Sequence, residues 1–541
     1  MKFNKVRISV ISALLCCALA AVPVKASGPN STPQWIDNAV IYEVNVRQFS
    51  EDSSFASLQA QLPRLRDLGV NVLWLMPIHP ISQVGRLGSL GSYYAVKDYK
   101  AVNPEFGTNE DFANFMSAAH NQGFKVVLDW VANHTGRDNV WITEENHDWF
   151  NWENGELVGP NGWNDVADLN FENADMRAAM IDAMKYWVTE YGVDGFRCDY
   201  AAGVPDDFWQ DAIAQLNQIK PVFMLAENED TAQLTNAFDA NYGWTFKDKF
   251  NSIASNRTGF AGLDWLVTER IANNPSGTTQ LMFITNHDEN SWNGTEYERL
   301  GSLVKMMTVL YFTLPGVPLV YTGQEISMNR ALAFFDKDPV DWNSGKDNVL
   351  LRKMISLKRN SSALNVGANA GHYERIATGN SQVYAFARTS VSGPANRVVV
   401  VANSSALAQT VVIPMGSKAA SYREALTNTL ISIPSSYRIT IPANGYRVFT
   451  TDLAGGINVR VTGIKLSQSS LVLKVGKKAR IAAYLTPGFP SNATVTWSSS
   501  NPRVATVSST GLITAKKRGV VTVVAKTSSR LVKASLKVTI R

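Results

Sequence analysis

Apolar residues at helical spacing alternate with short apolar runs along residues 35–325. In one such unit leucines recur on one face of residues 58–68, Gly69 can end the helix in the left-handed conformation, and the apolar run 70–76 follows. The other apolar runs lie at residues 39–42, 124–129, 193–199, 222–226, 281–284 and 317–321. Amphipathic helices that alternate with nearly continuous apolar strands predict a parallel sheet covered by helices.

The number of these units predicts an α/β fold, a closed (β/α)8 TIM barrel over residues 27–360. The position of the sixth strand, somewhere near residues 240–250, is not resolved by the pattern. The rhythm breaks after the third strand into a segment rich in Trp, Asn and Gly, which predicts a short excursion, domain B, at about residues 135–170.

After residue 360 the helical spacing fades and apolar and polar residues alternate, as in strands. Residues 361–453 are therefore expected to form an all-β sandwich, domain C. A glycine-containing linker at residues 454–456 precedes a second β-sandwich, expected at residues 457–541, which is rich in Ser, Thr and Val.

The N-terminus combines basic residues with an apolar run and small residues before position 27. This pattern predicts a signal peptide at residues 1–26 and a secreted protein, extracellular or associated with the cell surface. A lipid anchor at Cys16 or Cys17 is the alternative. No later stretch is long and apolar enough to cross a bilayer, and cleavage would leave Cys198 as the only cysteine, so no intramolecular disulfide is expected.

The net charge of +5 conceals two differently charged units. Residues 456–541 hold 15 Lys and Arg and no acidic residue, whereas residues 1–455 hold 36 basic and 46 acidic residues. No series of aromatic residues accompanies the basic charge, so nucleic acid is not an expected partner.

Carboxylates follow several predicted strands, where a parallel barrel places its functional groups. Asp199 stands two residues after Arg197, on the same side of its strand, and Glu227 and Asp288 end later strands. Asp129 ends the third strand. Glycoside hydrolysis needs one ionised carboxylate and one carboxylic acid, and Glu227 is the better acid because burial after an apolar strand would raise its pKa. Each carboxylate alone could equally be structural.

Four segments in order resemble the signature segments of the alpha-amylase family, glycoside hydrolase family thirteen. They are LDWVANH at 128–134, GFRCD at 195–199, LAE at 225–227 and TNHD at 285–288. Stretches within 41–49, 94–99 and 316–325 agree, so that the resemblance covers roughly residues 35–452.

This resemblance implies a retaining mechanism on three carboxylates. Asp199 would be the nucleophile, Glu227 rather than Glu229 the general acid and base, and Asp288 the stabiliser of the transition state. The substrate-binding residues implied are Tyr94, which would stack on the sugar ring, His134 and His287, which would hydrogen-bond it, and Arg197, which would orient the nucleophile.

Two features concern the contacts to the leaving part of the substrate and the binding of a metal ion. Many members of the family carry Lys-His shortly after the nucleophile, whereas Tyr200-Ala201-Ala202-Gly203 stands here. The resemblance also implies a calcium ion held by Asn133, by Asp165 or Asp168, and by the carbonyl of Gly203, all oxygen ligands that suit calcium. No organic cofactor is expected.

The function implied is hydrolysis of α-1,4-glucosidic bonds in starch or maltodextrin, with endo action as in an alpha-amylase, by a monomer. The alternative within the family is a maltogenic or transglycosylating enzyme. A third possibility is a non-catalytic glucan-binding or adhesion protein.

The C-terminal module resembles a bacterial immunoglobulin-like domain of group two, through segments at 461–464, 473–476, 495–502 and 504–507. Its basic charge suits an anionic cell-wall polymer or an acidic glycan surface as partner. A soluble spacer with a solvated basic surface is the alternative.

Overall fold

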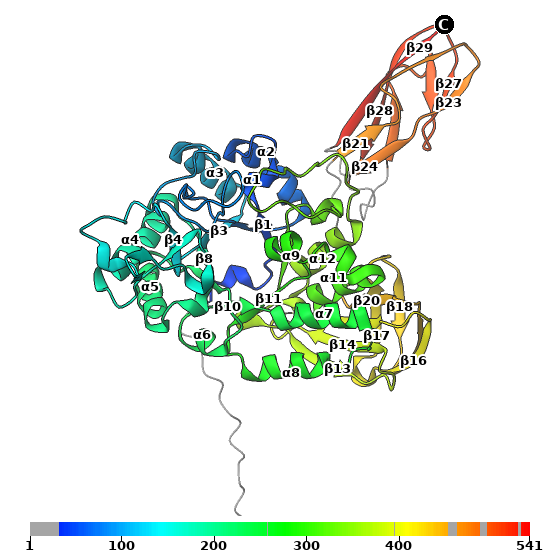
Figure 1. The fold of residues 1–541 in the computed structure, drawn as a ribbon. Helices are drawn as coiled ribbons and strands as arrows, with labels where there is room; N and C mark the ends of the chain where they lie inside the picture. The colour runs from blue at the N-terminus through cyan, green and yellow to red at the C-terminus, as the bar shows by residue number, and fades with distance from the viewer. Residues whose placement is uncertain (1–31, 257, 394, 453–462, 487–494, 528–531) are drawn as a thin grey trace, which may run out of the picture.

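The computed structural model describes residues 32–256, 258–393, 395–452, 463–486, 495–527 and 532–541. The expected signal peptide and the linker at 454–456 lie outside these residues. Eight parallel strands close into a barrel in the ring order β1, β2, β3, β8, β9, β10, β11 and β12 (Figure 1). The predicted closed parallel barrel is therefore confirmed.

The barrel strands are short, and most of their residues are buried on both faces. They are β1 (Ile41–Val44), β2 (Val72–Leu75), β3 (Lys125–Trp130), β8 (Gly195–Cys198), β9 (Phe223–Ala226), β10 (Ala240–Tyr242), β11 (Thr279–Met282) and β12 (Val317–Tyr321). Strands β8 and β9 approach most closely at Gly195, where an added Cβ would lie 2.1 Å from the carbonyl oxygen of Phe223. Only glycine fits this position without moving the neighbouring strand.

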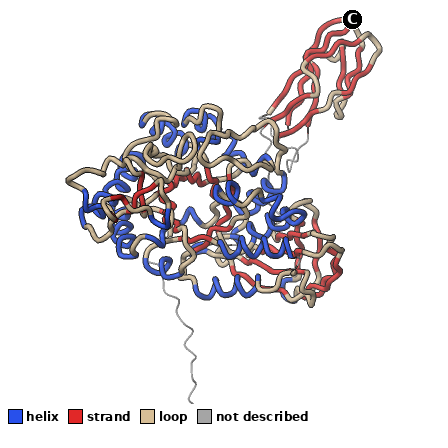
Figure 2. Tube along the Cα trace, in the orientation of Figure 1, coloured by secondary structure: helices blue, strands red, loops and turns tan. Residues whose placement is uncertain are grey.

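Helices surround the barrel strands, as Figure 2 shows in blue and red. They are α1 (Val46–Phe49), α2 (Phe55–Leu68), α3 (Asn109–Asn121), α4 (Ala174–Tyr191), α5 (Asp206–Ile219), α6 (Thr231–Asn236), α7 (Trp244–Asn256), α8 (Leu263–Asn273), α9 (His287–Trp292), α10 (Glu296–Leu300), α11 (Val304–Thr313) and α12 (Val349–Asn360). Helix α2 ends at Gly69 with φ 103°, and α3 begins with a capping box between Thr108 and Asp111. The end of α2 at Gly69 was predicted from the sequence, and the capping box stabilises the start of α3.

The sixth barrel strand is β10, which has only three residues. It pairs with β9 through Ala240 and Asn241 and with β11 along its whole length. A strand this short, with a central Asn and a Gly directly after it, shows no apolar run or alternation. Its place is decided by the two neighbouring strands, which explains why the sequence pattern left it open.

The excursion after β3 contains two small antiparallel pairs. Strand β4 (His134–Gly136) pairs with β7 (Val166–Asp168), and β5 (Trp152–Glu153) pairs with β6 (Glu156–Leu157). The β4–β7 pair sets His134 opposite Asp168. This pairing returns the excursion to the mouth of the barrel.

A six-stranded antiparallel sheet follows the barrel, in the order β13, β14, β15, β20, β17, β18, together with the pair β16–β19. The bounds are β13 (His372–Ile376), β14 (Val383–Thr389), β15 (Arg397–Asn403), β16 (Gln409–Pro414), β17 (Ala420–Glu424), β18 (Leu430–Ile433), β19 (Ser436–Ile441) and β20 (Tyr446–Thr450). Apolar residues from both sheets, among them Val399, Val401 and Ile413, share one buried core.

The C-terminal module is a second β-sandwich with a core of its own. Its strands are β21 (Gly463–Leu466), β22 (Ser470–Leu473), β23 (Lys478–Arg480), β24 (Ala483–Thr486), β25 (Val495–Ser499), β26 (Ala505–Val507), β27 (Leu512–Ala515), β28 (Gly519–Thr527) and β29 (Lys533–Ile540). Over the described residues, no helix combines the length and apolarity that crossing a membrane requires.

Candidate active site

One pocket of about 550 Å³ opens at the carboxyl ends of the barrel strands. The residues that line it are Leu87, Ser92, Tyr94, His134, Trp163, Asp165, Val166, Asp199, Tyr200, Glu227, Trp244, His287, Asp288, Trp292, Phe334 and Phe335. The three carboxylates expected to be catalytic therefore face one cavity, together with Tyr94 and both expected sugar-binding histidines.

Arg197 lies beneath the pocket and is fully buried. Its guanidinium donates to Asp129 Oδ1 at 2.8 Å and to Asp199 Oδ1 at 2.9 Å, and it forms an ion pair with Glu227 Oε1 at 2.7 Å. The hydroxyl of Tyr242 accepts a further hydrogen bond from Nε at 3.0 Å. One buried cation thus holds the carboxylates of three neighbouring strands together.

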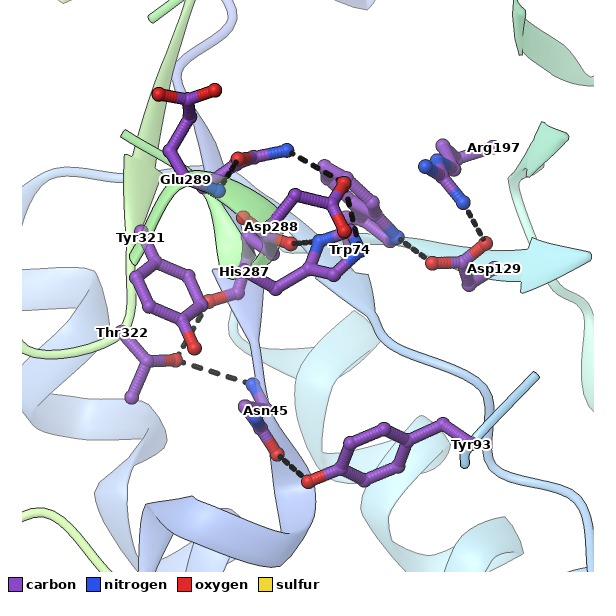
Figure 3. Close-up of polar contacts among 12 residues, drawn as sticks. Asn45, Trp74, Tyr93, Asp129, Arg197, His287, Asp288, Glu289, Tyr321 and Thr322 are labelled. Atoms are coloured by element: carbon purple, nitrogen blue, oxygen red, sulfur yellow. Dashed lines mark hydrogen bonds and ion pairs between the residues drawn. The ribbon is translucent and has the colours of Figure 1, made fainter. Parts of the chain in front are cut away.

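Asp129 is a buried acid beneath the pocket. Besides Arg197, it accepts a hydrogen bond from the indole of Trp74 at 3.2 Å (Figure 3). It accepts another from the hydroxyl of Tyr94 at 3.1 Å. Burial raises the pKa of Asp129 to about 6, although Arg197 acts in the opposite direction. Asp129 does not line the pocket, and its contacts suit it to hold Arg197 and Tyr94 in place.

Glu227 holds a proton more readily than an ordinary glutamate, even though it contacts Arg197. Burial and the nearby charges of Asp199 and Asp288 raise its pKa to about 8, against the opposing effect of Arg197. Its second oxygen accepts a hydrogen bond from the backbone N–H of Tyr200 at 2.9 Å. These effects favour the protonated form of Glu227, and the backbone donor orients the group.

Asp199 follows directly on β8, and its backbone N–H donates to the carbonyl of Trp130 at 2.9 Å. Its side chain is 13% exposed, against none for Arg197, so it reaches from the buried cation into the pocket. A carboxyl group with one oxygen on an arginine and its side chain on the pocket wall is placed for nucleophilic attack.

Asp288 is the most exposed of the three carboxylates, with one third of its side chain accessible. One of its oxygens lies 3.3 Å from His287 Nε2, and the amide of Asn286 donates to the same oxygen at 3.4 Å. His287 also contacts the hydroxyl of Tyr94 at 2.8 Å and Glu43 Oε1 at 2.5 Å. Burial lowers the pKa of His287, but Asp288 and Glu43 outweigh it and raise the pKa to about 9.

His134 stands on the opposite side, at the start of β4. Burial lowers the pKa of its imidazole, which is therefore neutral. Its Nδ1 accepts a hydrogen bond from the amide of Asn133 at 3.2 Å, so that Nε2 carries the proton. This arrangement leaves one N–H donor available to a bound polar group.

Aromatic rings form much of the remaining wall. Trp163, Trp244 and Trp292 line the pocket, whereas Trp130 is fully buried among His79, Tyr99 and Phe196. Tyr94 stacks on Phe334 at a centroid distance of 6.1 Å. Trp130 is thus a core residue, whereas the other three tryptophans face the pocket.

Several site residues escaped the sequence analysis. Glu43, Trp74 and Tyr242 contact the expected site residues from below, and Phe334 and Phe335 join the pocket wall from the loop after β12. Of these residues, only Glu43 could have been found from the sequence, because it is an acid directly after the first predicted strand.

The candidate calcium ligands gather near His134, next to the pocket. Asn133 Oδ1 would lie 2.2 Å from a Cβ at Gly203, so only glycine lets this amide approach the loop after β8. Asp165 and Asp168 act electrostatically on His134, and Asp168 accepts a hydrogen bond from Asn151 at 2.6 Å. Among the described residues, no three His, Cys, Asp or Glu side chains group as metal ligands, but this donor set, which includes amide and carbonyl oxygens, fits calcium.

The arrangement provides a carboxylic acid, an ionised carboxylate and a third acid on one cavity lined by aromatic rings. Aromatic faces and hydrogen-bonding edges are typical of sugar sites, and the two carboxyl groups supply the acid and the nucleophile of glycosidic cleavage. The chemistry available is displacement at an acetal carbon with protonation of the leaving oxygen.

Comparison with known proteins agrees with this geometry. The family model "Alpha amylase, catalytic domain" matches residues 54–365, and the model "Bacterial Ig-like domain (group 2)" matches residues 460–538. Both resemblances noted in the sequence are therefore confirmed.

Three relatives illustrate the match. The chain is 30% identical over 354 residues to "Alpha-amylase 3" of Dictyoglomus thermophilum, covering 57% of this chain and 68% of that protein. It is 27% identical over 414 residues to "Alpha-amylase MalA" of Haloarcula japonica, covering 73% of this chain but only 59% of that relative. The crystal structure of a "noncanonic maltogenic alpha-amylase AmyB" from Thermotoga neapolitana superposes with a TM-score of 0.69 at 27% identity, over 76% of this chain and 98% of that one.

Proposed function

This chain belongs to the alpha-amylase family of glycoside hydrolases, and we propose that it cleaves internal α-1,4-glucosidic bonds of starch or maltodextrin with retention of configuration. The observation that carries the proposal is the set of three carboxylates, Asp199, Glu227 and Asp288, on one pocket. Arg197 contacts both Asp199 and Glu227, so it places the nucleophile and the acid where they can act on the same glycosidic bond.

In the first step Asp199 attacks the anomeric carbon while Glu227 protonates the leaving oxygen. The raised pKa of Glu227 favours the protonated form that donates the proton, and Arg197 orients Asp199 by donating a hydrogen bond to Oδ1. In the second step Glu227, now deprotonated, takes a proton from water as the water attacks the glycosyl–Asp199 ester. Asp288 stabilises the positive charge that develops on the sugar in both transition states.

Replacement of Glu227 by Gln tests the assignment. The variant keeps the shape of the side chain but cannot donate the proton, so starch hydrolysis is expected to fall by a factor of at least about 10². Glu229→Gln is the matched control, because Glu229 bonds Thr245 and does not line the pocket. Full starch hydrolysis by Glu227→Gln would overturn the assignment.

A second candidate, release of short products or transfer to a sugar acceptor, is favoured by the aromatic surface beside Glu227. Tyr200 and Trp163 form an edge-to-face pair at 5.7 Å, both line the pocket, and Tyr200 bonds Glu227 through its backbone. A sugar seated on these rings would compete with water for the glycosyl intermediate. An even product ladder from amylose supports endo hydrolysis, whereas maltose alone or lengthened acceptors support the second candidate.

We also propose a calcium ion on Asn133, Gly203 and one or both of Asp165 and Asp168. The ion would supply positive charge that joins the excursion after β3 to the loop after β8. The proximity of Asn133 to Gly203 supports it. A chelator is expected to lower Tm, and calcium but not magnesium to restore it. An unchanged Tm would contradict the proposal.

The C-terminal module is proposed to hold the secreted enzyme on an anionic cell-wall polymer. Lys526 and Lys533 are exposed and lie directly opposite each other on β28 and β29, a pairing of like charges that costs stability. No acidic residue between 456 and 541 offsets it. Salt-sensitive retention of the full chain on an anionic polysaccharide, but not on a neutral one, is the expected result.

A further inference from the structure

A buried carboxylate behind His287 takes no part in the steps above. Glu43 is the third residue of β1 and is fully buried. Its backbone carbonyl accepts hydrogen bonds from the hydroxyl of Thr322 at 2.7 Å and the N–H of Thr322 at 3.1 Å, which fixes the strand end against the loop after β12. Its side chain points at the imidazole, with Oε1 at 2.5 Å from His287 Nδ1.

Among the described residues, His287 is the only ion-pair partner of this carboxylate. In the part of the chain that the structure describes, Glu43 Oε2 has no hydrogen-bond partner, and no lysine or arginine forms an ion pair with Glu43. A buried carboxylate without a countercharge costs several kcal/mol, roughly, so either Glu43 is protonated or His287 is charged.

The hydroxyl of Tyr94 places one proton on the imidazole of His287. Tyr94 donates its single proton to Asp129 Oδ2 at 3.1 Å, so its oxygen accepts at the contact of 2.8 Å with His287 Nε2. Nε2 therefore carries a proton. With a second proton on Nδ1, the ring is an imidazolium between Glu43 and Asp288, whose Oδ2 lies 3.3 Å from Nε2.

We propose that Glu43 is a positioning residue, which holds His287 as an imidazolium and through it directs the carboxylate of Asp288 into the pocket. The role extends the proposed hydrolase function, because Asp288 must carry its negative charge when the sugar becomes positive. Glu43 itself lies outside the pocket wall and touches no substrate.

The charged groups around His287 agree with this state. Asp288 on the same helix and Glu43 on β1 favour the charged ring, and Asp129 on β3 lies beyond Tyr94. Arg197 on β8 acts against it, as does burial, while the phenols of Tyr94 and Tyr321 stay neutral. The two flanking carboxylates outweigh the opposing effects, and the pKa of His287 is about 9.

Titration of His287 by NMR in wild type and in Glu43→Gln tests the proposal without any substrate. The signal is assigned with His287→Asn among the six histidines. Wild-type His287 is expected to titrate well above the ordinary range, and Glu43→Gln to lower that value by roughly 1–3 pH units, the effect of one adjacent charge. Glu43→Asp keeps the charge and is expected to restore most of the shift.

Enzyme kinetics provide a second test of the proposal. In Glu43→Gln, kcat on maltodextrin is expected to fall roughly 10–100-fold with little change in KM, and the alkaline limb of kcat/KM to move to lower pH. Glu296→Gln is the matched control, because Glu296 is a buried acid that bonds Gln324 and has no contact with the site.

Two results would overturn the proposal. One is a wild-type His287 that titrates in the ordinary histidine range, and the other is an unchanged titration in a folded Glu43→Gln. If Glu43→Gln does not fold, the wild-type and Glu43→Asp titrations decide. A wild type that titrates as expected but hydrolyses no α-glucan would contradict the proposed substrate and leave the role of Glu43 intact.

Discussion

At the scale of single residues, the site is organised by one buried arginine. Arg197 touches Asp129, Asp199 and Glu227, three acids that would otherwise repel one another in a place with little water. Their roles differ because burial and the charges of Asp199 and Asp288 drive Glu227 towards the protonated form, although all three acids contact the guanidinium. Glycosidic cleavage of this kind requires two neighbouring carboxyl groups, one protonated to act as the acid and one ionised to act as the nucleophile.

Arg197→Lys is expected to remove this organisation. A lysine is a point charge and cannot bridge three carboxylates, so kcat should fall at least about 100-fold. The free energy of unfolding should fall by roughly 3–5 kcal/mol, the effect of breaking buried ion pairs. Urea unfolding and maltodextrin kinetics measure both. Arg66→Lys, at an exposed pair with Asp67, is the control and should change neither.

The pH dependence follows from Glu227. Its pKa is raised to about 8, so the acid is present below that pH and is lost as pH rises through it. We expect kcat/KM on maltodextrin to decline above this value. A glycosyl fluoride, whose leaving group needs no proton, should lose less of its glycosylation rate over the same range. An alkaline limb near pH 5 would contradict the assignment of Glu227 as acid.

At the scale of elements, the close pairing of β8 and β9 brings nucleophile and acid together. Asp199 follows the last residue of β8, and Glu227 follows the last residue of β9. The strands are in register from Gly195 opposite Phe223 to Cys198 opposite Ala226. A change in this pairing would therefore move both carboxylates.

Gly195→Ala tests this coupling. The new methyl group would lie 2.1 Å from the carbonyl oxygen of Phe223, so the strands must separate. Overpacking of this kind costs roughly 1–3 kcal/mol or more, and kcat should fall with stability. Gly123→Ala is the control, since it has φ 84° but open space around it, and should cost about 1 kcal/mol with kcat unchanged. An active, stable Gly195→Ala would contradict the coupling.

At the scale of the whole molecule, the barrel and the C-terminal module have separate cores and opposite charge. The catalytic pocket is built entirely from residues 87–335. No strand of the module pairs with a strand of the barrel among the described residues. The module is thus expected to affect where the enzyme is held rather than how it cleaves.

Removal of residues 457–541 is expected to leave kcat/KM on a soluble maltodextrin unchanged, because no pocket residue is lost. Retention on an anionic wall polymer should be lost, and with it the salt dependence of binding. Kinetics and a pull-down on purified polymer check the two expectations. A marked fall in kcat/KM would show that the module contributes to catalysis.

The sequence by itself determined the barrel, because its strands and helices carry the periodicity of buried parallel sheets and amphipathic helices. It also determined which acids end strands, because period-two alternation sets Arg197 and Asp199 on one side of β8. These properties are local. They depend on spacing along the chain and on how each residue type partitions between water and the core.

Only the tertiary structure decided which groups surround those acids. Strand β10 carries no pattern of its own, yet it delivers Tyr242 to Arg197. Glu43 and His287 are 244 positions apart and meet at 2.5 Å because β1 and the loop after β11 end at the same mouth of the barrel. The protonation of Glu227 and His287 likewise depends on burial and on charges from distant strands, which spacing along the chain cannot show.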